Sequence, residues 1–393
     1  MKAPFPTPQA LAVLKSRESA MARLLGRFVR AESPSFDKSA VDRFGRIVAA
    51  EWNRRGAAVT ILRQRLRGDH IRAEWHPRGT RAKGQILVLG HLDTVYEMGT
   101  LARMPFRVSR GRAWGPGTFD MKGGLVIALY AVDALAAARC LPENRIVFLW
   151  TSDEEIGSQT SRALIEREAR RSDAVIVLEP AAGLDGRVKT SRKGVGEFEL
   201  AATGRAAHAG LNPEDGINAI EEIARQIARV SRWNQPRRGI TVNAGVIEGG
   251  TRTNVIPEHA RVTLDVRATR PADMRTLERR FRALRPILRG AHLKIHGGFN
   301  RPPMERSTSA ALYAKARALA KEMGRTLGEA RVGGGSDGNF TAALGVPTLD
   351  GLGAVGEGAH STNENVIIHK LAERAALLAG LLATLGKSAS PTP

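Results

Sequence analysis

Imidazole and carboxylate side chains follow three apolar runs of this chain. The runs are QILVLG (85–90), RIVFLW (145–150) and DAVIVL (173–178). The first run leads into His91 and Asp93, the second into Asp153, Glu154 and Glu155, and the third into Glu179. In an open α/β sheet, ligands collect at the carboxyl ends of the strands, because the loops there converge on a crevice. The pattern therefore predicts a metal-binding site at one edge of a sheet.

Five side chains are the candidate metal ligands. They are His91, Asp120, Glu155, Glu179 and His360. Neutral imidazole and carboxylate suit zinc, and a carboxylate-rich set can hold two divalent ions if one carboxylate bridges them. Two ions about 3.5 to 4 Å apart can share a water and hydrolyse an acyl bond without a protein nucleophile. The set therefore predicts a metal-dependent hydrolase.

Two acids next to these ligands are expected to assist them. Glu154 neighbours Glu155 and need not bind metal itself, so we expect it to act as the general base. It would take a proton from water and pass it to the leaving nitrogen. Asp93 could accept the other ring proton of His91 and fix the tautomer of that histidine. Cys140, the sole cysteine, lies in an alanine-rich helix and is expected to be an inert thiol.

The elements that must position these residues alternate along the first half of the chain. Residues 11–55 carry apolar positions at helical spacing, which predicts two helices before the sheet. The expected strands and helices that follow are strands 57–62, 70–75 and 85–90, helix 122–140, strand 145–150, helix 161–171 and strand 173–178. A long loop is expected to lead from the third strand to Asp120. This alternation favours parallel β-α-β units.

From about Gly194 the pattern changes to the order of a split β-α-β sandwich. Its expected segments are strand 195–204, helix 217–230, strands 241–250 and 260–270, helix 274–288 and strand 292–297. We interpret residues 193–299 as an inserted domain. Residues 1–192 and 300–393 are then the two parts of a single catalytic domain.

Composition limits the possible classes of protein. At 393 residues the chain is too long for one ordinary core, and no apolar stretch approaches the roughly 20 residues that span a bilayer. The N-terminus lacks the apolar core of a secretory signal, so a cytoplasmic protein without membrane contact is expected. The net charge is +21, but the 48 arginines are scattered through every segment. Because scattered charge mainly alters solubility and association rate, a basic nucleic-acid-binding protein is only a remote alternative.

Five motifs in this order resemble the M20 family of zinc metallopeptidases, in its glutamate carboxypeptidase branch. The motifs are GHLDTV (90–95), GPGTFDMKGG (115–124), TSDEEIGS (151–158), LEP (178–180) and GAHST (358–362). The resemblance implies a zinc exopeptidase-like α/β domain with a mostly parallel mixed sheet flanked by helices. It also implies that the insertion is a ferredoxin-like α+β domain that serves as lid and dimerisation domain.

The resemblance also implies roles for the metal-site residues. Asp120 would bridge two Zn²⁺ ions per subunit, with Co²⁺ or Mn²⁺ as possible substitutes. His91 and Glu179 would bind one ion, and Glu155 and His360 the other. Glu154 would be the general base and Asp93 the partner of His91. The peptide bond after Asp120 would be cis.

In the inserted domain and after it, the resemblance implies substrate contacts. His208, in ATGRAAHAG, would reach the active site of the partner subunit and stabilise the oxyanion. Asn254 would contact substrate, and Arg301 would hold its free carboxylate, for which a bidentate guanidinium is well suited. The remaining candidates for the same pocket are Gly334, Gly335, Ser336 and, as a weaker candidate, Arg187.

These inferences predict a homodimeric two-zinc exopeptidase or amidase. It would release a C-terminal amino acid, with glutamate favoured by the resemblance, from a small peptide or N-acyl amino acid. An N-acyl amino acid deacylase or a dipeptidase of the same family is the alternative. The sequence has Met121 where the family's variant motif has a second aspartate, a change that spares the ligand Asp120 and leaves fine specificity open.

Overall fold

The computed structural model describes residues 5–76, 82, 84–140 and 142–385. Within these residues the chain divides into two compact units. The larger unit contains the chain up to Ser191, Arg306–Arg331 and the chain from Ser336 onward. The inserted unit contains Arg192–Glu305 and Val332–Gly335. Because three segments build the larger unit, residues far apart in sequence can meet within it.

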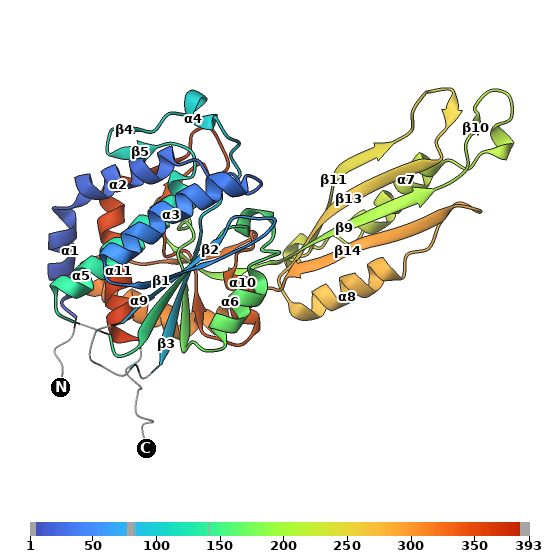
Figure 1. The fold of residues 1–393 in the computed structure, drawn as a ribbon. Coiled ribbons are helices and arrows are strands. Elements are labelled where there is room, and N and C mark those ends of the chain that lie inside the picture. Colours follow the sequence, from blue (N-terminus) through green and yellow to red (C-terminus); the bar gives the residue numbers. More distant parts are fainter. Residues whose placement is uncertain (1–4, 77–81, 83, 141, 386–393) are drawn as a thin grey trace, which may run out of the picture. The chain divides into compact units, whose positions relative to one another are not determined.

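A six-stranded sheet lies at the centre of the larger unit (Figure 1). Its strands, in spatial order, are β1 (Ala58–Leu62), β2 (His70–Trp75), β6 (Arg145–Thr151), β3 (Gln85–His91), β7 (Ala174–Val177) and β16 (Thr348–Leu349). Strand β3 pairs in parallel with β6 and β7, and β16 pairs in parallel with β7. Strands β1 and β2 pair antiparallel, as do β2 and β6. The predicted α/β class with a mixed, mostly parallel sheet is confirmed.

Helices cover both faces of this sheet. The helices of the first face are α1 (Thr7–Lys15), α2 (Glu18–Arg30), α3 (Lys38–Arg54), α5 (Gly123–Ala137), α9 (Arg306–Glu322) and α11 (Ile368–Thr384). On the other face, α6 (Arg162–Ala169) and α10 (Gly338–Ala343) share a core with Leu87 and Val147. Since alternate residues of β3 and β6 enter the two cores, their continuous apolar runs are explained by burial on both faces.

The N-terminal segment differs from the prediction. Two helices were expected between residues 11 and 55, but the structure contains three, α1 to α3. The break between α1 and α2 falls at Ser16 and Arg17, where no glycine or proline marks a turn. The two predicted helices correspond to α2 and α3, and the prediction missed α1, which is nine residues long and separated from α2 by only two residues.

A small second sheet in the larger unit joins segments that are far apart in sequence. Its order is β17 (Gly356–Glu357), β18 (Asn365–Ile367), β5 (Arg112–Trp114) and β4 (Arg107–Ser109). Strand β18 pairs antiparallel with β5. The expected loop before Asp120 thus contains this hairpin as well as helix α4 (Thr100–Arg103). Elsewhere β8 (Val188–Arg192) pairs with β15 (Glu329–Val332).

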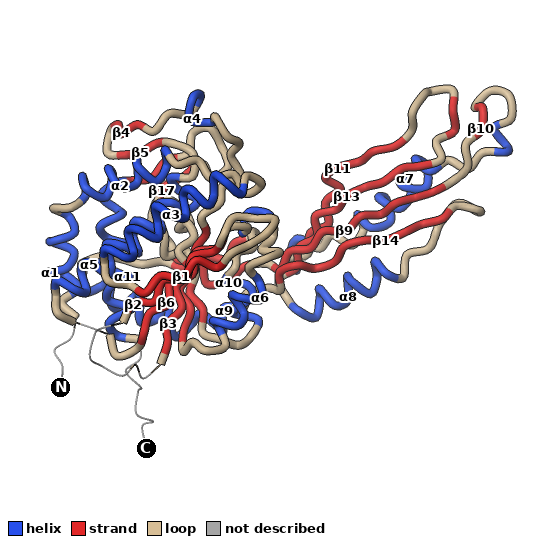
Figure 2. Tube along the Cα trace, viewed as in Figure 1, coloured by secondary structure: helices blue, strands red, loops and turns tan. Residues whose placement is uncertain are grey.

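The inserted unit has an antiparallel four-stranded sheet with two helices (Figure 2). The strand order is β11 (Thr241–Gly249), β13 (His259–Ala268), β9 (Gly194–Thr203) and β14 (His292–Arg301). Helices α7 (Ala219–Ser231) and α8 (Pro271–Arg282) share its core. The short strands β10 (Ala207–His208) and β12 (Val255–Ile256) pair with each other. The predicted order of strands and helices is confirmed.

Among the described residues, no helix combines the length and apolar character needed to cross a membrane.

Candidate metal centre

His91 lies at the carboxyl end of β3 and is almost completely buried. Its Nε2 lies 3.2 Å from Asp120 Oδ1 and 3.5 Å from Glu179 Oε1. Its Nδ1 forms a 2.9 Å hydrogen bond with the main-chain oxygen of Asp93 and lies 3.4 Å from the Asp93 carboxylate. Nδ1 therefore donates its proton to Asp93, and Nε2 is the ring nitrogen that faces the two carboxylates.

His360 lies in a second group of possible ligands, which shares Asp120 with the first. His360 Nε2 lies 3.2 Å from Glu155 Oε2 and 3.5 Å from Asp120 Oδ2. The first group is His91, Asp120 and Glu179, and the second is Asp120, Glu155 and His360. Within each group, the possible ligand atoms lie within 4.8 Å of one another. The two carboxylate oxygens of Asp120 face different histidines. This is the arrangement that a bridging carboxylate requires.

The electrostatics of the cluster favour bound cations. Burial opposes protonation of His91, but hydrogen bonds with Asp120, Asp93 and Glu179 raise its pKa well above the ordinary histidine value. Hydrogen bonds with Asp120 and Glu155 raise the pKa of His360 to about 10. Burial raises the pKa of the Glu155 carboxyl to about 7. Carboxylates gathered in this way stabilise positive charge at their centre, whether it is a proton or a metal ion.

The donor atoms fit zinc and related divalent ions. Three carboxylates and two imidazoles supply only oxygen and nitrogen, a set that zinc accepts in catalytic sites. Glu155 Oε1 is buried and has no hydrogen-bond partner. A buried carboxylate oxygen without a donor needs another source of positive charge. A metal ion would supply it.

Asp93 holds two of the ligand-bearing loops together. Its buried carboxylate accepts hydrogen bonds from the main-chain N–H groups of Glu154 (3.3 Å) and Glu155 (3.2 Å). The Ser35 hydroxyl donates to the same carboxylate at 2.7 Å. Asp93 therefore fixes the short 3₁₀ turn Glu154–Ile156 as well as His91. Glu154, the expected general base, is half-buried at the start of this turn.

The segment around Asp120 contacts the strand that carries His91. The peptide bond between Asp120 and Met121 is cis, as the family resemblance implied. The Met121 sulfur lies 3.2 Å from the main-chain nitrogen of His91 and accepts its N–H. Met121, the residue that departs from the family's variant motif, is buried and packs against the strand that carries His91.

Comparison with known proteins shows the family. The sequence model of the protein family described as Peptidase family M20/M25/M40 matches residues 87–384. The chain belongs to this family. It is a metallohydrolase that acts on peptide or amide bonds.

Two relatives and one solved structure show how far the similarity extends. Carboxypeptidase G2 of Pseudomonas sp. (strain RS-16) is 33% identical to the M20 protein, over 94% of this chain and 90% of the relative. Succinyl-diaminopimelate desuccinylase of Stenotrophomonas maltophilia is 30% identical, over 79% of this chain and 89% of the relative. The crystal structure of aminopeptidase PepT from Bacillus cereus has a TM-score of 0.75 at 22% identity and covers 93% of this chain and 98% of its own. The structural match shows a shared fold.

In the inserted unit of the M20 protein, Arg301 lies beside the glycines predicted to line the substrate pocket. Arg301 ends β14 and is 6% exposed. A Cβ atom at Gly335 would come within 2.8 Å of Arg301 Cδ, so a larger residue there would displace the Arg301 side chain. Arg192 donates to the main-chain oxygens of Gly334 and Gly335, at 3.1 Å each. Sequence analysis missed Arg192, because nothing in its local sequence distinguishes it from the many other arginines.

His208 and Asn254 lie close together at the paired strands β10 and β12. The main-chain oxygen of Asn254 accepts the N–H of Ala209 at 3.0 Å. His208 is exposed, and its Nδ1 accepts the N–H groups of Gly210 and Leu211, at 3.1 Å each. Because Nδ1 is an acceptor, the neutral ring carries its proton on Nε2. His208 can therefore donate a hydrogen bond from its outer nitrogen.

The structure gives the other two predicted substrate residues different surroundings. The Ser336 hydroxyl is buried and donates to Asp350 at 2.5 Å, so it organises the start of α10. Arg187 is half-exposed and pairs with Asp185 at 3.1 Å within its own turn. This local pair is an ordinary surface contact. It gives Arg187 no particular connection with the predicted ligands.

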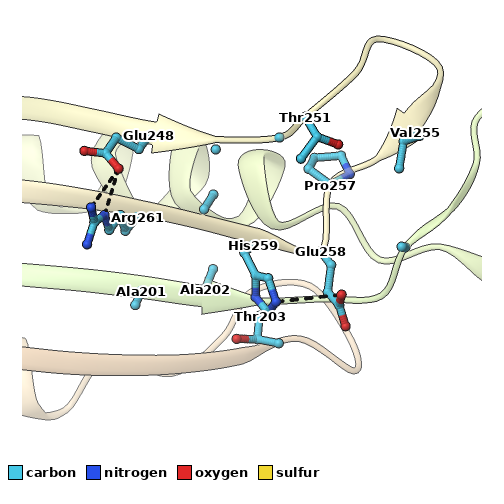
Figure 3. Close-up of a pocket in the computed structure, with 14 residues that line it drawn as sticks. Ala201, Ala202, Thr203, Glu248, Thr251, Val255, Pro257, Glu258, His259 and Arg261 are labelled. Atoms are coloured by element: carbon cyan, nitrogen blue, oxygen red, sulfur yellow. Dashed lines mark hydrogen bonds and ion pairs between the residues drawn. The ribbon is translucent and has the colours of Figure 1, made fainter.

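Figure 3 shows a pocket of about 460 Å³ on the inserted unit. It lies where β11 ends and β13 begins, and its walls include Thr203, Thr251 and Pro257. At one end of it, Arg261 pairs with Glu248 on the neighbouring strand at 2.7 Å. No predicted metal or substrate residue is among the residues that line the pocket. We therefore do not assign the hydrolytic chemistry to it.

Proposed function

We propose that this M20 enzyme releases a C-terminal amino acid, preferentially glutamate, from N-acyl or peptidyl substrates. The proposal of metal-dependent hydrolysis rests on the two groups of candidate ligands that share Asp120. Support for the substrate class comes from the 33% identity to carboxypeptidase G2 over 94% of the chain. The buried guanidinium of Arg301 is suited to bind a free carboxylate by two parallel hydrogen bonds.

In the proposed mechanism, two zinc ions would be held by the two groups of candidate ligands, His91 with Asp120 and Glu179, and Asp120 with Glu155 and His360. Such ions would supply Lewis-acid chemistry, polarising the scissile carbonyl and lowering the pKa of water. Glu154 accepts the proton of the attacking water and donates it to the leaving nitrogen. Asp93 keeps His91 in the tautomer whose Nε2 lone pair is available.

In the same mechanism, the inserted unit binds the substrate. Arg301 holds the C-terminal carboxylate, and the main chain of Gly334 and Gly335 lines the same pocket. Asn254 and the partner subunit's His208 donate hydrogen bonds to the carbonyl oxygen as negative charge develops on it. The Nε2–H tautomer of His208 supports this role, because only a donor stabilises an oxyanion.

A homodimer that uses the edge of the inserted sheet is part of the proposal. Strand β11 is an edge strand, and its residues from Asn243 to Gly249 are all exposed. Val246 and Ile247 are more than half exposed, which is unfavourable for an edge that stays in water. The pocket of Figure 3 lies at the end of this strand. A second copy of the chain that pairs with β11 would cover both the exposed apolar side chains of this strand and the pocket at its end.

Substrate preference tests the proposal. Zinc-loaded protein is expected to hydrolyse an N-acyl glutamate with a higher kcat/KM than the matching alanine, leucine and phenylalanine substrates. Arg301→Ala should raise KM for the glutamate substrate, whereas Arg275→Ala, an exposed arginine on α8, should not. Equal rates for all four substrates, or an unchanged KM in Arg301→Ala, would contradict the proposed specificity.

An N-acyl amino acid deacylase is the second candidate. The 30% identity to a succinyl-diaminopimelate desuccinylase supports it, since that relative's name describes removal of an acyl group from an amino acid. The two candidates share the metal chemistry and differ in which half of the substrate is recognised. If kcat/KM varies more with the acyl group than with the amino acid, the deacylase is the better description.

A further inference from the structure

Glu364 is a completely buried carboxylate four residues after His360. Its two oxygens accept three main-chain hydrogen bonds from the loop that carries Asp120. Oε2 accepts the N–H of Gly117 at 2.9 Å, and Oε1 accepts those of Phe119 at 2.7 Å and Asp120 at 2.9 Å. Gly117 has a positive φ of 70°, which turns the backbone so that nearby N–H groups point inward. The loop is thus a concavity of the kind that successive N–H groups form, and the Glu364 carboxyl group occupies it.

The same carboxylate is linked to the loop that carries His360. The Tyr96 hydroxyl donates to the main-chain oxygen of Ser361 at 2.9 Å, next to His360. The same Ser361 oxygen accepts the main-chain N–H of Glu364 at 3.2 Å. Tyr96 follows His91 by five residues. Three ligand-bearing segments, which contain His91, Asp120 and His360, therefore meet around one buried acid.

The backbone strengthens this connection. The main-chain oxygen of Glu364 accepts the N–H of Gly115 at 3.2 Å, and the next residue, Asn365, lies opposite Trp114 where β18 pairs with β5. Side chain and main chain of one residue thus bind the Asp120 loop at several points. Glu364 itself is neither a candidate metal ligand nor a group expected to touch substrate.

We propose that Glu364 is a positioning residue that couples the Asp120 loop to the His360 loop, so that the bridging carboxylate and the last ligand are set together. This inference rests on the proposed two-ion centre. Asp120 belongs to both ligand groups, so a displaced Asp120 would lower the affinity for both ions rather than for one. Tyr96 has a supporting part, because it fixes the Ser361 carbonyl beside His360.

Glu364→Gln tests this role with little change of shape. An amide has one acceptor oxygen, so it cannot accept at both Oε positions, and its NH₂ group would face an N–H of the loop. The metal-free protein would be titrated with Co²⁺, while the visible absorption and the number of bound ions are recorded, and with Zn²⁺ by calorimetry. Removal of groups that orient metal ligands typically weakens affinity by about 10- to 100-fold, and we expect a loss of this size at both ions. The Co²⁺ absorption bands should change as well, because the ligand geometry changes.

Glu222→Gln is the matched control. Glu222 lies in the inserted unit, is also completely buried, and accepts the main-chain N–H groups of Ile287 (3.0 Å) and Leu288 (2.7 Å). It has the same chemistry without any link to a predicted ligand. Its substitution should lower the melting temperature and leave Co²⁺ and Zn²⁺ affinity unchanged. A loss of affinity in Glu222→Gln equal to that in Glu364→Gln would show a general effect of stability and overturn the inference.

Tyr96→Phe keeps the inference testable if Glu364→Gln does not fold. This change removes only the hydroxyl and should give a folded protein with a smaller loss of metal affinity and an altered Co²⁺ spectrum. Wild-type affinity and spectrum in whichever of the two variants folds would overturn the positioning role. If the wild-type protein itself bound no pair of ions, the proposed function would fail instead, so the two failures are distinguishable.

Discussion

At the scale of single residues, buried carboxylates organise this site as much as the ligands do. Asp93 accepts hydrogen bonds from the turn that carries Glu155, and Glu364 accepts them from the loop that carries Asp120. Three of the five candidate ligands, His91, Glu155 and Glu179, have a visible pattern in the sequence, because each follows an apolar run. The role of Glu364 could not be predicted, because main-chain N–H groups can bind a carboxylate whatever the side chains of their residues are. An acid next to the apolar run NVII was the only available signal.

Asp93→Asn is expected to weaken metal binding although it removes none of the candidate ligands. The amide would present an NH₂ group to the N–H of Glu154 or Glu155, so the turn after β6 should shift. A loss of about 10- to 100-fold in Zn²⁺ affinity is expected, as measured by titration of the metal-free protein. Asp69→Asn is the control, since Asp69 is equally buried but pairs with Lys38 and Arg63. Equal affinity in Asp93→Asn and wild type would refute this role.

At the scale of elements, the long strands and helices could be predicted and the short strands could not. Strands β3, β6 and β7 are buried on both faces, so they appear in the sequence as uninterrupted apolar runs. Strands β5 and β18 have three residues each, too few to show an alternation, and they pair across about 250 positions of sequence. Their pairing depends on the fold around them. The segment before Asp120 was therefore expected to be a loop, although it contains the hairpin that anchors the C-terminal part of the site.

Trp52 illustrates how α3 is fixed to the sheet beneath the site. Its ring is completely buried and stacks on Phe148 of β6, with ring centroids 4.0 Å apart. Trp52→Ala should reduce the free energy of unfolding by about 3 to 5 kcal/mol, because it removes apolar contact and leaves a cavity. Val13→Ala, at a residue of α1 that is half exposed, should change it by less than about 0.5 kcal/mol. Urea unfolding followed by circular dichroism measures both; equal effects would contradict this account of the packing.

At the scale of the whole molecule, the metal centre is a product of long-range assembly. His91, Glu155 and Glu179 come from the first half of the chain, and His360 comes from the last segment. The inserted unit lies between them in sequence and has its own hydrophobic core. The sequence indicated this insertion, because strands and helices change their order near Gly194. That Val332–Gly335 belongs with the inserted unit could not be predicted, because glycine has no side chain whose pattern reports packing.

Mixing two inactive variants tests whether the proposed active site needs two subunits. Glu154→Gln removes the proposed base, and His208→Ala removes the proposed oxyanion donor; each homodimer should lose roughly two orders of magnitude or more in kcat. In a mixed dimer, one site combines an intact Glu154 with the partner subunit's intact His208, so part of the wild-type rate should return after subunits exchange. A further substitution, Ile247→Lys on β11, should abolish dimer formation, as measured by light scattering. It should also abolish the recovery of activity on mixing. If the mixture stays inactive although mixed dimers form, His208 does not act across the subunit interface. The exposed β11 edge would then have to be explained by a different contact.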